Sequence, residues 1–462
     1  MTRLQFDPEL IKRYDKAGPR YTSYPTAVSF TPEFTVADYR QHAALSHERG
    51  DSAPLSLYFH IPFCDTVCFY CACNKIATKD YSKADTYLDY LYREIDMHAA
   101  LYDRSRTVEQ LHFGGGTPTF LSVSQMRALM EKIRSAFTLL DGDQGEYSIE
   151  IDPRSVTDET IAALRGMGFN RFSLGVQDVN EQVQKAVNRI QPLSMSRDII
   201  EACRRHGAGS VSVDLIYGLP FQTVESFTTT LDEIIRLSPD RLSVFNYAHL
   251  PTLFKPQRRI NEADLPAAEV KLQILDLTIA KLTGAGYEYI GMDHFAKPQD
   301  ELAQAQKNGT LHRNFQGYTT HAECDLVAMG VSAISSVADC YAQNEKELDA
   351  YYARIDAGEI PITRGLSLTR DDVIRREVIQ ELACHFRLDF AALGERLGLD
   401  FASYFAPELS DGMKHLIDDG LVRLTSDDLQ VLPAGRFLIR NICMVFDRRL
   451  REQKEQRFSR VI

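Results

Sequence analysis

The stretch LSLYFHIPFCDTVCFYCAC, residues 55–73, joins an apolar run to a loop in which four cysteines fall within ten residues. Its first seven residues form a nearly continuous apolar segment. Such a run is typical of a strand that is buried on both faces of a parallel sheet. The cysteines therefore follow the carboxyl end of a predicted strand.

Five further segments repeat this pattern along the chain. They are QLHFGG from Gln110, YSIEID from Tyr147, RFSLGVQ from Arg171, VSVDLIYG from Val211 and RLSVFNY from Arg241. Amphipathic stretches at residues 83–102, 122–137 and 223–237 lie between them and predict helices. Strand–helix alternation repeated six times predicts an α/β fold with a parallel sheet and right-handed crossovers. A run from Tyr287 predicts a further strand at the edge.

Glycine and proline cluster directly after these strands. The clusters lie at residues 60–62, 114–118, 152–153 and 218–220. In parallel α/β folds the loops at the carboxyl ends of the strands carry the active site. We therefore expect the cysteine loop and these clusters to meet at one end of the sheet.

The length of 462 residues is too great for one ordinary core. We predict an N-terminal extension at residues 1–50, an α/β domain at 51–355 and a small, mostly helical domain at 356–462. The segment GPRYTSYPTA from Gly18 is either a coil packed on the surface or a cap over the active-site mouth.

The C-terminal region has the pattern of a winged helix. Helices are expected at residues 369–386, 409–420 and 435–450, and a hairpin is expected around residues 426–428. Winged helices often bind DNA. Because acidic residues (Asp411, Asp418 and Asp419) precede this hairpin, we favour a lid or structural role.

The overall charge is acidic, with 52 basic and 64 acidic residues and a formal net charge of −12. Nucleic-acid binding needs a basic face, so this balance argues against such a partner. No run approaches the roughly 18 apolar residues of a membrane span, and the N-terminus has no signal-like apolar stretch. We therefore expect a cytoplasmic protein, a compartment in which nine cysteines do not form a disulfide framework. Five of them are scattered and are expected to be small buried side chains: Cys203, Cys324, Cys340, Cys384 and Cys443.

The remaining cysteines have the spacing of a metal-cluster loop. Cys64, Cys68 and Cys71 form CxxxCxxC, and Cys73 follows two residues later. Three thiolates in one loop can hold three corners of a four-iron four-sulfur cluster and leave the fourth iron open to a ligand. A zinc site would favour two CxxC pairs far apart in sequence, and a two-cluster ferredoxin would need a second cysteine run. Cys73 could be a fourth ligand, a catalytic thiol or a bystander, and we favour a catalytic thiol that does not bind iron.

The CxxxCxxC loop after the first strand resembles that of the radical S-adenosylmethionine superfamily. Residues 114–118, GGGTP, follow the second strand, where that family places the glycine-rich stretch that meets the methionine amino group of the cofactor; glycine permits close backbone approach. Glu150 resembles the family's carboxylate that bonds the ribose hydroxyls, although alone it could be a salt-bridged strand-end acid. A narrower resemblance, to bacterial oxygen-independent coproporphyrinogen III oxidases, covers essentially the whole chain. Its eight motifs are GPRYTSYPT, YFHIPFCDTVCFYCACNK, FGGGTPT, SLGVQD, VNR, DLIYGLP, FNYAHLP and HRNFQGYTT.

This resemblance implies a partial (β/α)6 barrel and an enzyme that converts two propionates of coproporphyrinogen III to vinyl groups, giving protoporphyrinogen IX. It implies a four-iron four-sulfur cluster on Cys64, Cys68 and Cys71 and two bound molecules of S-adenosylmethionine. The contacts it implies for the iron-bound molecule are Tyr58, Gly115, Glu150 and Ile334, and Gly114 of the glycine-rich stretch is a further implied cofactor contact. Those it implies around the second molecule are Tyr70, Gly116, Thr117, Gln177, Arg189, Asp214 and Ala248. We also expect an electron donor protein as partner, and a monomer.

Simpler roles exist for several of these residues. Asp214 and Gln177, at predicted strand ends, could each cap the following helix, and Arg189 could face a helix dipole. His294, His312 and Arg313 could face the substrate, although such residues are more often surface polar groups, and Arg20 could bind a propionate.

Three rival functions are considered. A heme chaperone of the same family usually has an aromatic residue at the Cys73 position and lacks the YTSYPT segment, so both features favour the enzyme. A radical methylase would transfer a methyl group. A simple electron carrier would leave Glu150 and the GGGTP stretch without a purpose.

Overall fold

The computed structural model describes residues 7–16, 18–48 and 53–452. These residues form two compact units, each built from separated segments. The barrel unit comprises residues 30–285 and 323–367, and the C-terminal unit comprises the described parts of 1–29, 286–322 and 368–462. The division differs from the contiguous domains predicted at 1–50, 51–355 and 356–462. The physical reason is that two earlier segments pack against the C-terminal helices.

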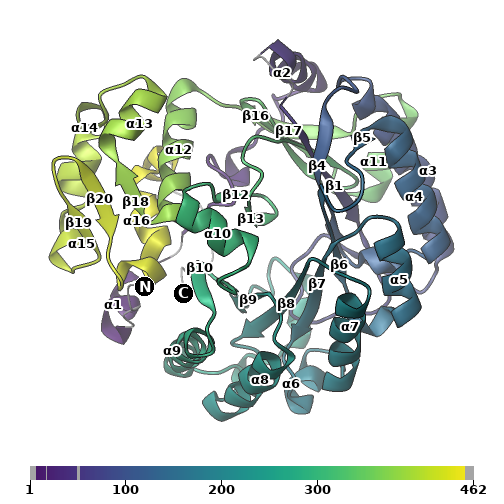
Figure 1. Ribbon diagram of the computed structural model, residues 1–462, viewed down its shortest axis with the longest axis horizontal. Helices are drawn as coiled ribbons and strands as arrows, with labels where there is room; N and C mark the ends of the chain where they lie inside the picture. The colour runs from purple at the N-terminus through teal and green to yellow at the C-terminus, as the bar shows by residue number, and fades with distance from the viewer. Residues whose placement is uncertain (1–6, 17, 49–52, 453–462) are drawn as a thin grey trace. The chain divides into compact units, whose positions relative to one another are not determined.

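Six parallel strands form the core of the barrel unit, and their order in the sheet follows their order in the sequence (Figure 1). They are β1 (Leu55–Ile61), β4 (Thr107–Gly115), β6 (Glu146–Ile151), β7 (Arg171–Gln177), β8 (Ser210–Tyr217) and β9 (Arg241–Asn246). Each coincides with a predicted strand, so the predicted α/β fold with a parallel sheet is confirmed. The loops at their carboxyl ends consequently share one rim.

Four strands extend this sheet beyond β1 and were not predicted. β14 (Asp325–Met329) pairs parallel to β1, and an antiparallel series continues the sheet with β15 (Ile334–Val337), β16 (Cys340–Asn344) and β17 (Ile362–Ser367). All five residues of β16, CYAQN, are buried. The sequence hides this strand because its buried amides are satisfied by hydrogen bonds; Asn344 donates to Gly330 O at 2.9 Å.

Helices α3 (Ser82–Ala99), α4 (Val123–Ala136), α5 (Asp158–Gly166), α7 (Leu193–Arg205) and α8 (Val224–Leu237) lie on the outer side of the parallel strands (Figure 1). Three of them begin with a capping box, whose N-cap residues are Ser122, Thr157 and Thr223. These caps fix the helix starts directly after the loops at the rim.

The C-terminal unit contains the long helix and the hairpin that the sequence predicts. The helix is α12 (Arg370–His385), and the hairpin is β19 (Val422–Leu424) with β20 (Asp428–Val431). A third short strand, β18 (Arg387–Asp389), pairs with β20. The run from Tyr287 also forms a strand, β10 (Glu288–Gly291), which pairs with β11 (His294–Ala296) inside this unit.

A buried cluster explains why residues 286–322 belong to this unit. Ile290 of β10, together with Leu311 and Tyr318, packs with Cys384 of α12. Strands β12 (His312–Asn314) and β13 (Gly317–Thr319) form a hairpin. Leu311 directly precedes β12, and Tyr318 lies in β13. The HRNFQGYTT motif is therefore a hairpin seated on α12.

The start of the chain packs on the same unit. Tyr21 donates to Asp447 at 2.9 Å, and Asn441 donates to Tyr14 O at 2.9 Å. Arg440, on helix α16 (Ile439–Phe446), donates to Pro19 O at 2.9 Å. The segment 18–27 is therefore an ordered part of the C-terminal unit, and its role as an active-site cap stays a prediction.

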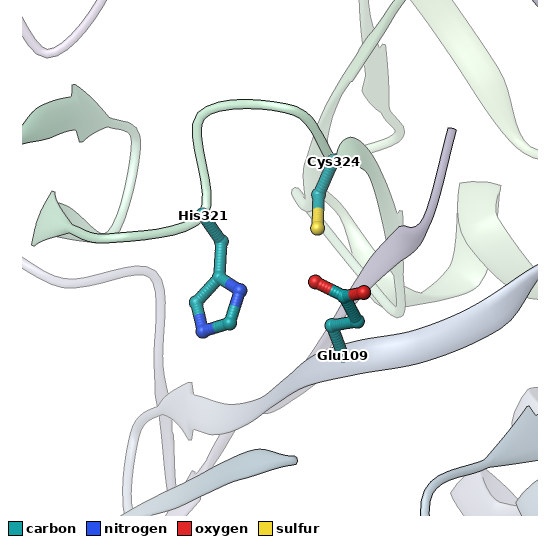
Figure 2. Close-up of side chains that lie close together, drawn as sticks. All are labelled: Glu109, His321 and Cys324. Carbon is teal, nitrogen blue, oxygen red and sulfur yellow. The ribbon is translucent and has the colours of Figure 1, made fainter. Parts of the chain in front are cut away.

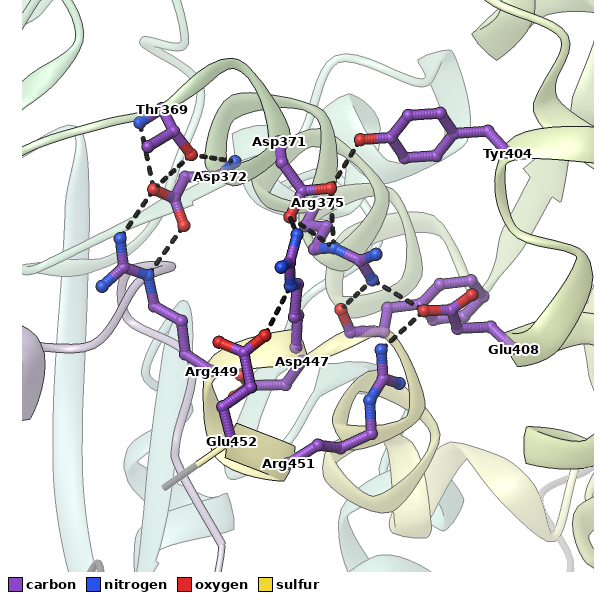
Figure 3. Close-up of polar contacts among 12 residues, drawn as sticks. Thr369, Asp371, Asp372, Arg375, Tyr404, Glu408, Asp447, Arg449, Arg451 and Glu452 are labelled. Carbon is purple, nitrogen blue, oxygen red and sulfur yellow. Dashed lines mark hydrogen bonds and ion pairs between the residues drawn. The ribbon is translucent and has the colours of Figure 1, made fainter.

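An ionic network holds the last described helices against α12 (Figure 3). Arg375 bonds Asp371 at 2.9 Å, Glu408 at 2.9 Å and Phe446 O at 2.9 Å. Arg449 grips Asp372 with two bonds of 2.8 Å. Because Arg375 and Glu408 are both buried, each charge depends on its partner.

Within the described part of the chain, no helix is long and apolar enough to cross a membrane.

Candidate active site

The four clustered cysteines line one cavity of about 220 Å³ in the barrel unit. Their loop starts at β2 (Phe63–Cys64) and returns at β3 (Ile76–Ala77), which pairs parallel to β2. Cys64 and Cys68 are buried, Cys71 is half-buried and Cys73 is exposed. A short loop that closes on itself thus brings the predicted ligand sulfurs to a common space.

The loop after helix α6 (Glu181–Ala186) forms two hydrogen bonds with the cysteine loop. Val187 O accepts from Phe69 N at 2.9 Å, and the Asn188 amide donates to Val67 O at 2.8 Å. Sequence reasoning noted the VNR motif but assigned a role only to Arg189. The role of Asn188 becomes visible only when two segments 121 residues apart meet.

Two arginines and one aspartate surround the sulfur of Cys68. Arg189 Nη1 lies 3.6 Å and Arg154 Nη2 lies 3.7 Å from Cys68 Sγ. Asp152 bonds both arginines, Arg154 at 2.6 Å and Arg189 at 3.1 Å. Burial opposes the charge of Arg189, but Tyr70, Asp152 and Cys68 hold its pKa above the ordinary value. Arg154 and Asp152 were not among the predicted site residues.

The glycine-rich stretch lies against the cysteine loop. Gly116 N donates to Ile61 O and Thr117 N donates to Phe63 O, both at 2.8 Å, and the Thr117 hydroxyl reaches Cys64 Sγ at 3.4 Å. A Cβ on Gly116 would lie 2.6 Å from Pro62 O. Only glycine fits this approach, and Gly115, with φ +120°, adopts backbone angles that favour glycine as well.

Glu150 is the second-to-last residue of β6 and lines the cavity. Its Oε2 accepts from Gly115 N at 3.3 Å, and its Oε1 lies 3.6 Å from His112 Nε2. Tyr58 stacks on His112 with ring centroids 5.7 Å apart. Nearly half of the Glu150 side chain is exposed, so its carboxylate is available to a ligand in the cavity.

Gln177 and Asp214 also line the cavity. The structure contradicts the alternative that they cap helices, because the N-caps of α6 and α8 are Asn180 and Thr223. Gln177 has φ +70°, and its buried Oε1 has no hydrogen-bond partner among the described residues. Burial, followed by the charge of Glu150, raises the pKa of Asp214 to about 6.

Two family models match separate parts of the chain. Residues 58–234 match the Radical SAM superfamily, and residues 368–438 match the HemN C-terminal domain. The chain is 54% identical to the oxygen-independent coproporphyrinogen III oxidase of Pseudomonas aeruginosa, over 99% of both chains. It is 52% identical to that of Escherichia coli K12, over 100% of this chain and 99% of the other.

The chain belongs to the oxygen-independent coproporphyrinogen III oxidase family. A solved structure described as coproporphyrinogen III oxidase (HemN) from Escherichia coli, a radical SAM enzyme, superposes with a TM-score of 0.92 at 50% identity. The superposition covers 97% of this chain and all of the other. The predicted family and fold are therefore confirmed.

Members of the radical SAM superfamily carry a four-iron four-sulfur cluster and S-adenosylmethionine, and the cavity of this coproporphyrinogen oxidase homologue fits both. Soft sulfur ligands from Cys64, Cys68 and Cys71 suit an iron–sulfur cluster. Burial raises the pKa of the Cys64 thiol to about 11, so without a metal that sulfur stays protonated at neutral pH. Metal binding would displace this proton.

The structure brings most of the predicted site residues of this family member to the cavity. Those that line it are Cys64, Cys68, Cys71, Cys73, Tyr70, Gly115, Gly116, Thr117, Glu150, Gln177, Arg189 and Asp214. Four others are not among the lining residues: Tyr58 stacks on His112, Gly114 lies beside Glu150, Ala248 follows β9, and Ile334 begins β15. A cofactor contact for these four stays a prediction.

The suggested substrate-binding residues of this coproporphyrinogen oxidase homologue lie in its C-terminal unit. Arg20 forms an ion pair with Asp293 at 3.7 Å. Arg313 is buried against the ring of Tyr318, 4.7 Å from its centroid. His312 is half-buried, and burial lowers its pKa to about 4, so its imidazole is neutral at neutral pH.

The scattered cysteines are buried with one exception. Cys203, Cys340, Cys384 and Cys443 are buried as expected, whereas Cys324 is half-buried. Figure 2 shows the Cys324 thiol facing the carboxylate of Glu109. Burial, with a contribution from Glu109, raises the pKa of this thiol to about 12.

Proposed function

We propose that this chain catalyses the oxidative decarboxylation of coproporphyrinogen III to protoporphyrinogen IX, converting two propionate side chains to vinyl groups. The observation that carries the proposal is the cavity that joins the CxxxCxxC cysteines to Glu150 and the GGGTP stretch. Identity of 52–54% to oxygen-independent coproporphyrinogen III oxidases along the whole chain supports the substrate.

In this proposal Cys64, Cys68 and Cys71 would hold the cluster and leave one iron for the methionine part of S-adenosylmethionine. The chemistry that these groups supply when bound is one-electron cleavage of the carbon–sulfur bond, which yields methionine and a 5′-deoxyadenosyl radical. Cys73 is proposed as a thiol that serves the reaction without binding iron.

The chain's own residues bind and orient the cofactor. Glu150 accepts hydrogen bonds from the ribose hydroxyls, and the close backbone of the glycine-rich stretch at Gly115 contacts the methionine amino group. Two molecules of S-adenosylmethionine are proposed. The second is assigned to the neighbourhood of Tyr70, Gly116, Thr117, Gln177, Arg189, Asp214 and Ala248. The unpaired Oε1 of Gln177 supports this assignment, because a buried acceptor needs a donor.

The proposed reaction balances for each propionate in three transfers. A hydrogen atom leaves the β-carbon and is carried away on 5′-deoxyadenosine. The carboxylate leaves as carbon dioxide, and one electron passes to an acceptor, so that a vinyl group remains. Holding the β-carbon at contact distance from the radical is the protein's main contribution, because ordered reactants avoid the entropic cost of encounter.

An anaerobic assay tests this function. Reconstituted protein, a reductant, S-adenosylmethionine and coproporphyrinogen III should yield protoporphyrinogen IX, carbon dioxide and two 5′-deoxyadenosine molecules per product. The matched control, Cys64→Ala, should yield none of these. Stoichiometric heme binding without decarboxylation would instead identify a heme chaperone, and methyl transfer would identify a methylase.

The remaining partners are part of the same proposal. An electron donor protein would reduce the cluster, and the chain would act as a cytoplasmic monomer. Neither a nucleic acid nor a membrane is proposed as a partner. The formal net charge of −12 argues against nucleic-acid binding.

A further inference from the structure

The sulfur of Cys68 faces two guanidinium groups. Arg154 and Arg189 point N–H groups at it, at 3.7 Å and 3.6 Å. The sulfur of Cys64 receives the neutral hydroxyl of Thr117, at 3.4 Å, and the cation beside Cys71 is the ammonium of Lys75. All of these groups line the same cavity, so each ligand sulfur has its own polar partners.

Asp152 holds this arrangement in place. Its Oδ1 accepts from the backbone N–H of Arg154 at 3.0 Å, as the N-cap of the short helix at Pro153–Ser155. Its Oδ2 accepts from Arg154 Nη2 at 2.6 Å and from Arg189 Nη1 at 3.1 Å. One carboxylate therefore orients two guanidinium groups, and the trio keeps one net positive charge beside Cys68.

The side chains of the trio are largely withdrawn from water. Their exposed fractions are 20% for Arg154, 12% for Asp152 and 7% for Arg189. Solvent therefore screens their field weakly, so they act on the neighbouring sulfur more strongly than a surface pair would.

We propose that Arg154, oriented by Asp152, is a positioning residue for the redox centre, which sets the reduction potential of the cluster by donating an N–H to the Cys68 thiolate. Reduction adds a negative charge to the cluster, and a hydrogen bond from a cation to a ligand sulfur stabilises that charge. Net charge and hydrogen bonds to sulfur are the means by which proteins tune iron–sulfur potentials. Arg154 therefore makes the reduced, reactive state easier to reach.

Substitution of Arg154 tests the effect on the reduction potential without changing a proposed cofactor contact, whereas substitution of Arg189 does not. Arg189 is also a proposed contact of the second S-adenosylmethionine, so changing it would alter two properties. Arg154 bonds Asp152 through its Nε as well, at 2.9 Å, which fixes the plane of its guanidinium. The inference rests on the cluster of the proposed function and not on the identity of the substrate.

The experiment is a redox titration of the reconstituted cluster, followed by electron paramagnetic resonance without S-adenosylmethionine. In Arg154→Met the ratio of reduced to oxidised cluster at a fixed potential should be about tenfold lower than in wild type. This corresponds to a reduction potential that is lower by about 59 mV for one electron. Arg154→Lys keeps the positive charge but loses the planar guanidinium group. Its reduction potential should lie between those of wild type and Arg154→Met. Arg165→Met, which removes an arginine paired with Asp143 away from the cavity, should leave the potential unchanged.

An unchanged potential in Arg154→Met with full iron content would overturn the proposal and leave the proposed function standing. If Arg154→Met fails to retain iron, Arg154→Gln decides: a lowered potential supports the proposal and a wild-type potential overturns it. Wild-type protein that binds no cluster under these conditions would overturn both the proposal and the proposed function.

Discussion

The side-chain amide of Asn188 donates a 2.8 Å hydrogen bond to the carbonyl oxygen of Val67, between two cysteines of the cluster loop. Removing this bond in Asn188→Gly should speed iron loss to a chelator about fivefold, because one such hydrogen bond contributes about 1 kcal/mol. Glycine suits the backbone here, since Asn188 has φ +54°. Anaerobic transfer of iron to a coloured chelator measures the rate.

Asn188→Ala provides the comparison. It removes the same hydrogen bond. It also introduces alanine at a positive φ, where the Cβ is sterically unfavourable and no polar side chain compensates, so iron loss should be faster than in Asn188→Gly. Iron release from Asn188→Gly at the wild-type rate would show that the contact does not stabilise the cysteine loop.

Gly116→Ala should prevent assembly of the cluster site. The new methyl group would lie 2.6 Å from Pro62 O and 2.8 Å from Phe63 O. Both are backbone atoms of the segment that leads into Cys64, so relief of the clash must displace that segment. We expect less than half of the wild-type iron after reconstitution, measured by metal analysis. The control Gly166→Ala adds a methyl group with no atom within 4 Å and should retain wild-type iron.

Glu150→Gln should weaken binding of S-adenosylmethionine about tenfold. A carboxylate accepts hydrogen bonds from hydroxyls more strongly than a neutral amide does, and the half-exposed position of Glu150 reduces the gain. Equilibrium dialysis against reconstituted protein measures the affinity. The matched control is Glu146→Gln, at the other end of the same strand and not among the cavity-lining residues. Equal affinity in Glu150→Gln and wild type would remove Glu150 from the cofactor site.

Arg375→Met should destabilise the C-terminal unit by about 1–3 kcal/mol, because it removes the buried partner of Glu408 and leaves that carboxylate with Arg451 alone (Figure 3). Hydrogen exchange of α12, read by mass spectrometry, should show the loss of protection. Lys12→Met serves as control in the same unit, since its ion pair with Glu9 is exposed and contributes about 0–1 kcal/mol. Similar effects of the two changes would contradict the importance of the buried network.

The same network predicts a pH dependence. Burial alone would raise the pKa of Asp372 and Glu408, but hydrogen bonds from Arg449 to the first and from Arg375 and Arg451 to the second hold both pKa values below the ordinary range. Between the folded and unfolded pKa values the unfolded chain binds more protons. The stabilisation is therefore fully present above about pH 4 and is lost as the pH falls through the lower folded values. Exchange protection of α12 should fall over that range, and Arg375→Met should show a smaller fall.

The parts of the molecule that follow from local pattern could be predicted from the sequence. Strand β1 is buried on both faces, so its apolar run identifies it, and β8 is identified by the alternation of buried and half-buried residues along most of its length. The rule that active sites lie at the carboxyl ends of parallel strands predicted that Glu150 and Gln177 lie near the cysteines, and both line one cavity with them; Asp214, inside β8, lines the same cavity. These are consequences of residue type and periodicity.

What the sequence could not predict depends on contacts between distant segments. In the sequence, Arg154 resembles an ordinary surface arginine. Only the fold brings it against Cys68, which is 86 residues away along the chain. Asn188 and Gln257 act on the cysteine loop only through backbone carbonyls, and neither residue type signals that role. The buried polar strand β16 likewise depends on hydrogen bonds that no periodicity reveals.

The central claim is that Cys64, Cys68 and Cys71 hold a cluster with one iron open to S-adenosylmethionine. The most direct test is electron paramagnetic resonance of the reduced, anaerobically reconstituted protein before and after this cofactor is added. We predict about four irons per chain, a cluster signal that changes on addition, and retention of that signal in Cys73→Ala but not in Cys71→Ala. An iron-free protein, or a cluster signal that does not respond to S-adenosylmethionine, would contradict the claim.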